Sequence, residues 1–568
     1  MWRFAGLIIV IAFLLSGREP AAIPDFAPPV QGGMQLTGTF GELRGNHFHA
    51  GLDIRGAVGR PVYAVADGFV ARIVVKGGGY GQALYLDHPS GHTSLYGHLD
   101  RFREDIATFV KRRQYDLESF ELDEELNPAH FPVRQGDLIG YIGKRGFAFG
   151  PHLHFELRDR ETQDPLNPMS FGLDVADTRP PFVEAIRLYE LDERGNPLRG
   201  ESQQVRRLAS HRYTTAEDTL WVNGPSFGLA VKAYDQQNSL NNWNGIYQMA
   251  LRQDDSLRFA FAFERYGFDK TRYLNAHLDF EEQQQGSWFH RCFRLPGNQL
   301  KFYRPSEDGG RLQLAPGEAS RVTIEISDKA GNQCTVEAVV KRRARPLTPI
   351  YEQAYVYQLP YDEESVIDNG SFRAHFAPFT FYEDLYFQYT LVPEKSAGIY
   401  SAVHQLHDHL TPVHRYFDLQ IRPNEIAPAL RKKAIIAYCA DGNNPYSFGG
   451  EWTSENRLRA RVRALGNYSI MVDTIGPRIR PERWSGNMRG WEQFSFRISD
   501  NFPTAGDARD LRFRAEVDGT WILMEYDAKT ARLYHVFDGI ISRGEHRLKL
   551  TVTDDRENTT LWEGTFVL

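Results

Sequence analysis

The sequence predicts a mainly β protein, in which a small antiparallel β domain with a helical insertion precedes a series of β-sandwich domains. Short segments of alternating apolar and polar residues, separated by turns, run along most of the chain, which contains 49 glycines and 30 prolines. Only one stretch shows clear helical periodicity. At about 150 residues per domain, the 568 residues correspond to roughly four domains.

The composition excludes several classes of protein. Hydrophobic residues make up 42% and aromatic residues 13% of the chain, which is too much for a disordered protein. The net charge of −7 gives no overall basic surface, so we expect no nucleic-acid partner. Three cysteines in 568 residues are too few for a disulfide scaffold. Cys292 and Cys334 could form one disulfide, and their spacing alone does not decide this.

The N-terminus has the layout of a secretory signal peptide, which we predict at residues 1–22. Arg3 precedes an apolar run over residues 4–15, and small residues follow. The alternative is an uncleaved N-terminal anchor, because no A-x-A cleavage site stands out. We therefore expect export to the periplasm or cell envelope, and no stable membrane span, since no segment has the length of apolar sequence that one needs.

Residues 35–175 are expected to form the small β domain. The segment 61–74 predicts two strands around an Asp-Gly turn, and residues 82–96 continue a β meander. The stretch 101–132 differs, because its apolar residues recur at spacings of three, four and seven with charges between them. This pattern predicts an amphipathic helix that ends near Asn127, inserted in the β domain.

Beyond residue 176 the chain repeats itself. Asp177-Thr178 and Asp473-Thr474 each open a similar strand-entry segment. Three strand-exit segments, around Asp235, Asp328 and Asp554, end in turns rich in Asp and Asn, whose side chains bond their own backbone. We therefore predict sandwich domains at 177–345, 346–472 and 473–568. These segments resemble the immunoglobulin-like accessory domains of bacterial exported proteins, and their partners are unknown.

Four histidines and one aspartate in the β domain suggest a metal site. They are His49, Asp53, His98, His152 and His154. Residues two apart on a strand face the same side, so His152 and His154 should point into one space. Two histidines and a carboxylate are what a catalytic zinc site needs, with the fourth position left to water. Zinc would lower the pKa of that water to roughly 7, and a remaining histidine could act as a base.

Spacing alone leaves the roles of these residues open. Glu156 lies on the same strand face and is a possible ligand, and His47 is a possible substitute for His49. A stray His-x-His pair on a strand is more often a pair of ordinary buried or surface histidines. A second group of histidines, at 404, 407, 409 and 414, has no spacing that matches a ligand set.

Six ordered motifs resemble those of lysostaphin-type (LytM-type) zinc metalloendopeptidases, which cut peptide cross-links in bacterial peptidoglycan. The resemblance spans about residues 40–168. The motifs are His49-x-Gly51-x-Asp53, Pro61 to Gly68, Gly79-Tyr80-Gly81, Leu95-Tyr96-Gly97-His98-Leu99, Gly136 to Gly140, and Gly150-Pro151-His152-Leu153-His154-Phe155-Glu156.

The resemblance implies that His49, Asp53 and His154 are the ligands of a Zn²⁺ cofactor, and that His98 and His152 are two catalytic histidines. Peptidoglycan peptides would be the substrate. The insertion at 101–132, where most members have a short loop, is a departure from the family, as is the absence of a recognisable wall-targeting repeat. The alternatives are a non-hydrolytic regulator or wall-binding scaffold with a masked zinc site, and a general peptidase of exported proteins.

Overall fold

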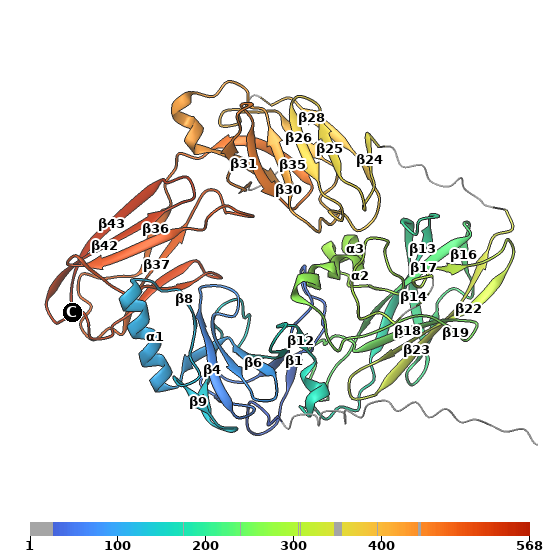
Figure 1. The fold of residues 1–568 in the computed structure, drawn as a ribbon, viewed down its shortest axis with the longest axis horizontal. Coiled ribbons are helices and arrows are strands. Elements are labelled where there is room, and N and C mark those ends of the chain that lie inside the picture. The colour runs from blue at the N-terminus through green and yellow to red at the C-terminus, as the bar shows by residue number, and fades with distance from the viewer. Residues whose placement is uncertain are drawn as a thin grey trace, which may run out of the picture.

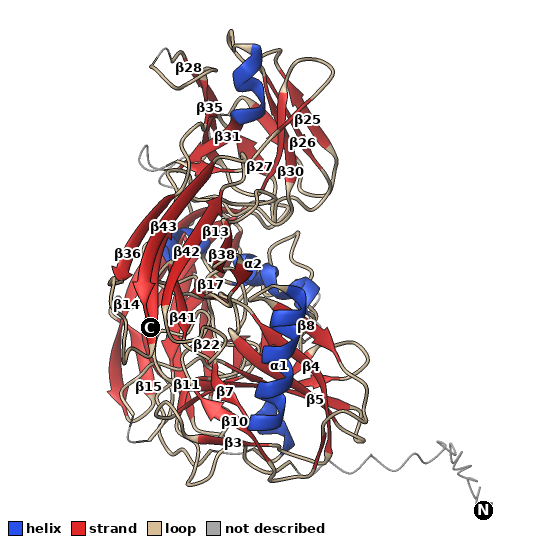
Figure 2. Ribbon diagram, turned by 90° about the vertical axis from the view of Figure 1, so that its left-hand side faces the viewer, coloured by secondary structure: helices blue, strands red, loops and turns tan. Residues whose placement is uncertain are grey.

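The computed structural model describes residues 26–173, 175–238, 240–304, 306, 308–345, 355–394, 396–440 and 445–568. The predicted signal peptide at 1–22 lies outside these residues. The prediction of a mainly β protein is confirmed, because strands dominate the secondary structure (Figure 2). Within the described residues the sheets fall into four groups that share no strand. We call them the N-terminal (26–173), second (175–345), third (355–473) and C-terminal (474–568) units.

The N-terminal unit contains a large antiparallel sheet and a small one. Between them lies a core of aliphatic and aromatic side chains. In spatial order the large sheet consists of β1 (Leu36–Gly38), β2 (Leu52–Arg55), β11 (His152–Asp159), β6 (His92–Gly97), β5 (Gln82–Asp87), β4 (Gly68–Val75) and β8 (Leu122–Glu125), with β12 (Pro165–Leu166) beside β11 and β9 (Pro132–Val133) beside β4. The small sheet consists of β3 (Pro61–Tyr63), β10 (Leu138–Ile142) and β7 (Leu99–Phe102), and the short helix η1 (Pro168–Phe171) follows.

The insertion is helical over only part of the expected range. Helix α1 (Glu104–Leu117) buries Ile106 and Val110 against the core, but it ends at Leu117 rather than near Asn127. Glu118 closes it in the left-handed conformation, and its backbone N–H bonds to carbonyls of the last turn. The following residues pair with the edge of β4 as strand β8. The expectation of helix here is wrong, because the edge of the sheet offers these residues backbone partners that periodicity does not reveal.

The second unit, in its described residues, is an eleven-stranded sheet with three short helices between residues 262 and 290. Its strands, in spatial order, are β19 (Ser256–Ala262), β18 (Gln248–Gln253), β22 (Ala319–Ser327), β23 (Gln333–Arg342), β15 (Arg212–Thr215), β14 (Pro197–Ala209), β13 (Phe182–Leu191), β17 (Ser226–Tyr234) and β20 (His290–Arg291), with β16 (Leu220–Val222) beside β23 and β21 (Leu312–Gln313) beside β17. The helices are η2 (Phe268–Tyr273), α2 (Leu274–His277) and α3 (Phe280–Gln284). Cys292 and Cys334 are buried free thiols in this unit, so they do not form the disulfide that the sequence leaves open.

The third and C-terminal units are each built from facing antiparallel sheets. The third comprises β24 (Tyr357–Leu359) with β27 (Leu385–Phe387); β25 (Ser365–Asp368), β26 (Phe372–Phe376), β30 (Phe417–Ile421), β34 (Leu458–Val462) and β33 (Glu451–Trp452); and β28 (Tyr389–Val392), β29 (Val403–Leu406), β35 (Gly466–Val472), β31 (Ala434–Cys439) and β32 (Tyr446–Ser447), with helix η3 (Pro428–Lys433). The C-terminal unit comprises β36 (Arg478–Arg483), β37 (Gln493–Ser499), β41 (Arg532–Val536) and β40 (Glu525–Asp527), and β39 (Thr520–Trp521), β38 (Arg512–Val517), β42 (Glu545–Thr553) and β43 (Thr559–Val567).

The four units follow one another around a ring, so that the C-terminal unit returns to lie beside α1 of the N-terminal unit (Figure 1). The closing contact includes a hydrogen bond of 2.5 Å from the Tyr115 hydroxyl to Asp538 and an ion pair of 3.1 Å between Lys111 and Asp538. In the described part of the chain, every helix is too short or too polar to cross a membrane.

Candidate metal centre

Two paired strands bring the predicted ligands together. In the register of β2 with β11, His154 lies directly opposite Asp53, and His49 precedes β2 in a loop that folds back over the same face. On its other side β11 pairs with β6, where His154 lies opposite Gly97, so His98 follows within reach of the group. Leu153 and Phe155 alternate with the histidines and are buried in the core, as the period of two in a strand predicts.

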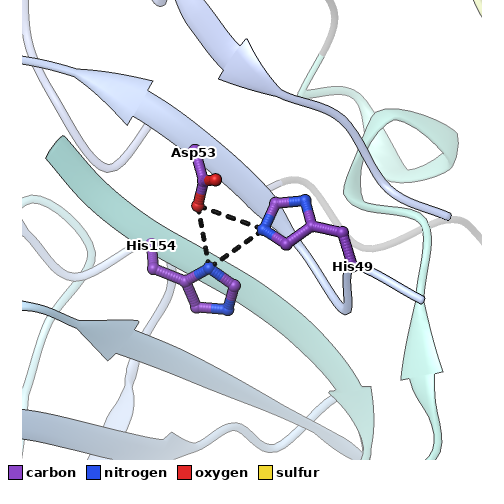
Figure 3. Close-up of side chains that lie close together, drawn as sticks. All are labelled: His49, Asp53 and His154. Atoms are coloured by element: carbon purple, nitrogen blue, oxygen red, sulfur yellow. Dashed lines mark hydrogen bonds and ion pairs between the residues drawn. The ribbon is translucent and has the colours of Figure 1, made fainter. Parts of the chain in front are cut away.

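Three ligand-type atoms from these residues converge on one point (Figure 3). Nε2 of His49 lies 3.1 Å from Oδ1 of Asp53, Nδ1 of His154 lies 2.9 Å from the same oxygen, and the two nitrogens are 3.1 Å apart. His49, Asp53 and His154 are only 5%, 9% and 6% exposed. The predicted ligands therefore form one buried cluster.

The outer ring nitrogens of both histidines are held by acceptors. Nδ1 of His49 donates to the carbonyl of Thr39 at 2.8 Å, and Nε2 of His154 donates to Oε1 of Glu156 at 2.8 Å. Each bond orients its ring so that, when the imidazole is neutral, the lone pair of the other nitrogen is directed at the common point. A carboxylate or carbonyl behind each histidine is the arrangement that supports metal-binding imidazoles.

The chemistry of this donor set fits a cation. Two imidazole lone pairs and a carboxylate oxygen face one another at about 3 Å, and this arrangement is repulsive unless a positive charge lies between them. Burial opposes the charged form of each group. Without a metal, hydrogen bonds to Asp53 and Glu156 nevertheless raise the pKa of His154 to about 9, so that a proton on Nδ1 takes the place of the cation, and the neighbouring histidines hold the pKa of Asp53 well below its usual value. Two nitrogens and one oxygen are a ligand set that zinc accepts.

His98 and His152 flank the cluster, with ring centroids 4.8 Å apart. Nδ1 of His98 donates to the carbonyl of Arg145 at 2.8 Å, and Nδ1 of His152 donates to that of Gly150 at 2.9 Å. Both rings therefore present Nε2, and that of His152 lies 3.4 Å from Oδ1 of Asp53. The backbone of His98 has a φ of 60°, a left-handed conformation that is uncommon outside glycine and concentrates at functional sites.

The structure separates the two alternative ligands from the cluster. Glu156 is fully buried, but its carboxylate bonds the outer nitrogen of His154, the Tyr80 hydroxyl at 2.5 Å and the Arg158 guanidinium at 2.6 Å. It therefore lies behind His154 and does not face the common point. His47 is exposed, and its ring bonds the carbonyl of Gly45. The histidines at 404, 407, 409 and 414 belong to none of the ligand groups found among the described residues.

Sequence reasoning missed the partners that hold the histidines. Tyr80 lies in one of the six motifs, but nothing in the spacing shows that it reaches Glu156. The carbonyls of Thr39 and Arg145 have no sequence signal, because backbone groups occur at every position. The C-terminal unit also holds this region. Glu525 and Tyr534 bond the Arg145 side chain, and Lys529 bonds the carbonyls of Lys144 and Ala148.

Comparisons with known proteins assign part of the chain to families. Residues 47–115 match peptidase family M23, and residues 356–473 match a Zu5-like domain. The latter match lies in the third unit, so the resemblance of the later units to immunoglobulin-like domains stays a prediction.

Two curated relatives match about a quarter of the chain. The DD-carboxypeptidase/endopeptidase Mpg of Neisseria meningitidis is 35% identical over 127 residues, which are 22% of this chain and 23% of that protein. The peptidoglycan DD-endopeptidase ShyB of Vibrio cholerae is 29% identical over 158 residues, 28% of this chain and 31% of that protein. The chain thus spans about a quarter of the length of the Neisseria relative.

Among solved structures, a zinc-containing peptidase from Vibrio cholerae matches with 27% identity and a TM-score of 0.20, covering 27% of this chain and 41% of the other. The ordered motifs and the family match lie in the same stretch of sequence, and both curated relatives are named as endopeptidases. The N-terminal unit therefore contains a peptidase M23 (LytM-type) domain.

Proposed function

We propose that this protein is an exported zinc metalloendopeptidase that hydrolyses peptide cross-links or stems of bacterial peptidoglycan. The observation that carries the proposal is the buried cluster of His49, Asp53 and His154, with three donor atoms within 3.1 Å of one another. The relatives named as DD-carboxypeptidase/endopeptidase and as peptidoglycan DD-endopeptidase support the substrate class.

His49 through Nε2, Asp53 through Oδ1 and His154 through Nδ1 would hold the zinc ion. When bound, zinc supplies a Lewis acid that lowers the pKa of water to roughly 7 and polarises a substrate carbonyl. Thr39 and Glu156 orient the two histidines, so both rings already point toward the position that the metal would take.

His98 and His152 are the proposed catalytic histidines. Burial, followed by the charges of His154 and His152, lowers the pKa of His98 to about 3, so its ring stays neutral at physiological pH. A neutral Nε2 can accept a proton from water or, after that transfer, donate a hydrogen bond to the developing oxyanion. The order in which His98 and His152 take these roles is not assigned.

A pair of matched histidine substitutions tests the ligand set. His49→Ala is expected to abolish both zinc binding and hydrolysis, whereas His47→Ala, two residues away in the same loop, should retain both because His47 is exposed and outside the cluster. Zinc content is measured by atomic spectroscopy, and products from defined muropeptides by mass spectrometry with and without chelator. A His49→Ala or His154→Ala protein that still cleaves muropeptides would refute the assignment, and zinc loss in His47→Ala would favour the alternative ligand.

A second candidate, a non-hydrolytic regulator or wall-binding scaffold with a masked site, draws support from one feature. The C-terminal unit contacts the segment 144–148, whose Arg145 carbonyl holds His98. A full-length protein that binds zinc and peptidoglycan but releases no product from any muropeptide would favour this function. Digestion of casein at a rate similar to that of muropeptides would instead favour a general peptidase of exported proteins.

A further inference from the structure

Three aspartates of the second unit meet at its junction with the N-terminal unit. Asp177 lies five residues before β13, Asp235 follows the last residue of β17, and Asp328 follows the last residue of β22. Each contributes one oxygen to a group in which all atoms lie within 4.8 Å of one another. Asp235 is 4% exposed and Asp328 is 5% exposed, so these charges are removed from bulk water.

The C-terminal unit contains the same arrangement. Asp473, Asp500 and Asp554 form a second group with the same maximum separation of 4.8 Å. Asp473 lies five residues before β36, Asp500 follows β37, and Asp554 follows β42, so all three occupy the positions of the first group. Tyr234 pairs with the first residue of β13, and Ser499 pairs with the first residue of β36, so the registers also agree.

The hairpin turns support both groups in the same way. The side chain of Asn332 donates to Asp328 at 2.7 Å and to the carbonyl of Asp177 at 3.1 Å. Asn558 makes the equivalent bonds to Asp554 at 2.8 Å and to the carbonyl of Asp473 at 3.1 Å. Each asparagine therefore fixes one carboxylate beside the segment that carries another.

One carboxylate of the first group, that of Asp235, lacks a partner that a buried charge needs. Asp177 accepts bonds from the backbone N–H groups of Arg179 and Asn238, and Asp328 accepts two from Asn332. Oδ1 of Asp235, in contrast, is buried and accepts no hydrogen bond from the described residues. The nearby Arg179 directs its guanidinium to Gln236 and to the carbonyl of Leu240. A buried carboxylate in this state is destabilising unless a proton or a cation compensates its charge.

The group borders a cavity of about 40 Å³, which has room for an ion or a water molecule. Its lining includes all three aspartates, and Leu36 and Thr39 close it from the N-terminal unit. In the second group, Oδ1 of Asp500 likewise accepts no hydrogen bond from the described residues. Lys433 acts electrostatically on Asp473, but its ammonium group donates to Asn558 and to the carbonyl of Arg556.

We propose that Asp177, Asp235 and Asp328 bind a calcium ion at the junction of the N-terminal and second units, and that Asp473, Asp500 and Asp554 bind a second one at the junction of the third and C-terminal units. An oxygen-only ligand set without histidine or cysteine selects a hard cation. Two oxygens on one Ca²⁺ ion are at most twice the bond length apart, roughly 4.8 Å, and the separations in both groups meet this limit.

Calcium at the first site would fix the junction next to the catalytic cluster. Gln237, two residues after Asp235, accepts a hydrogen bond of 2.8 Å from the backbone of Leu36 in β1. Thr39, which follows β1 and lines the cavity, holds His49 through its carbonyl. The ion would therefore act as a clamp between units, and it is distinct from the proposed zinc ion.

The test uses the full chain, freed of metal on a chelating resin and reloaded with one equivalent of Zn²⁺. Calcium binding is measured by equilibrium dialysis at millimolar Ca²⁺, and unfolding by calorimetry with NaCl of matched ionic strength as the reference. We expect two calcium ions per chain. When the free Ca²⁺ concentration is a hundred times its Kd, the melting temperature of the second unit should rise by roughly 5–10 °C.

Asp235→Asn and Asp500→Asn should each remove one of the two calcium ions. Asp255→Asn, at an exposed aspartate in a turn of the second unit, is the matched control and should retain both. Without calcium, Asp235→Asn is expected to melt no lower than the wild type, because Oδ1 of Asp235 accepts no hydrogen bond that the substitution would remove; with calcium it should melt lower. Failure of the wild type to bind calcium, an unchanged stoichiometry in either variant, or equal destabilisation of Asp235→Asn with and without calcium would overturn the proposal.

Discussion

Replacing Glu156 by glutamine tests whether the residues behind the ligands set the metal affinity. Oε1 of Glu156 accepts the bond from Nε2 of His154, and Oε2 lies 2.6 Å from the guanidinium of Arg158, whose side chain is buried. Glutamine keeps the shape of the side chain and one acceptor oxygen, but it removes the negative charge. Its amide NH2 group would face a donor, either Nε2 of His154 or the guanidinium of Arg158. The substitution therefore weakens both the support of His154 and the only ion pair recorded for Arg158 among the described residues.

The magnitudes of the two effects differ. Removing a partner behind a ligand typically costs a factor of 10–100 in metal affinity, about 1.4–2.8 kcal/mol. Breaking a buried ion pair on one side costs about 3–5 kcal/mol of folding free energy. We therefore expect Glu156→Gln to bind zinc 10–100 times more weakly and to unfold at lower denaturant concentration.

Competition with a chromophoric chelator measures the zinc affinity in the absence of denaturant. Circular dichroism shows under the same conditions that the variant has the native fold. Tyr80→Phe is the matched control, because it removes a neighbouring donor to Glu156 and keeps the charge. It should lower stability by about 1.5–3 kcal/mol and change zinc affinity far less. A folded Glu156→Gln protein with wild-type zinc affinity would refute the reasoning.

Three further predictions concern the surroundings of the site. Glu525→Gln weakens the hold on Arg145, whose carbonyl positions His98, so kcat should fall by up to roughly a hundredfold. Arg514→Ala, at the other end of the contact between the two units, is the control and should change kcat little. A faster Glu525→Gln enzyme would instead indicate that the C-terminal unit masks the site. Phe149 is fully exposed three residues before His152, so Phe149→Ala should raise KM for muropeptides without changing the melting temperature, and an unchanged KM would exclude substrate contact. Burial, partly offset by Arg291, raises the pKa of Glu383 to about 7. The wild type should therefore lose up to about 3 kcal/mol of its free energy of unfolding as the pH rises from about 4.5 to above 7. Thermal unfolding at pH 4.5 and pH 8 measures this loss, which Glu383→Gln should lack.

The sequence predicts the candidate site better than its surroundings. His152 and His154 follow from the period of two in a strand, and ordered motifs identify Asp53 and His98 as their companions. The role of Glu156 as the partner behind His154 does not follow from the sequence, because Glu156 lies on the same side of the strand as His152 and His154. Only the rotamer of His154 shows that Glu156 bonds the outer ring nitrogen and is not itself a ligand. The end of α1 at Leu117 depends on the free edge of β4, which is formed by a distant segment.

The aspartates show the same limit. Asp328 and Asp554 are recognisable as turn residues, and the similarity of Asp177 to Asp473 is visible in the sequence. Their convergence requires the register of β13 with β17 and of β36 with β37, together with the hairpins that return beside them. Pairing between strands that lie far apart in sequence has no local signal, so the groups appear only in the folded chain.

The second unit is part of the support of the candidate site and not only an attachment to it. Phe48, the neighbour of His49, is buried in the core of the second unit, where its backbone N–H bonds Thr271 and its carbonyl accepts from Tyr266. Thr39 adds a link through Gly245. The loop that carries His49 is therefore held from both of its ends by residues beyond 175. Truncation after the N-terminal unit would expose Phe48 and free this loop, so a loss of activity in such a fragment would not show that the intact site is inactive. Substitutions in the full chain, such as Glu525→Gln, separate masking from support because they leave these contacts in place.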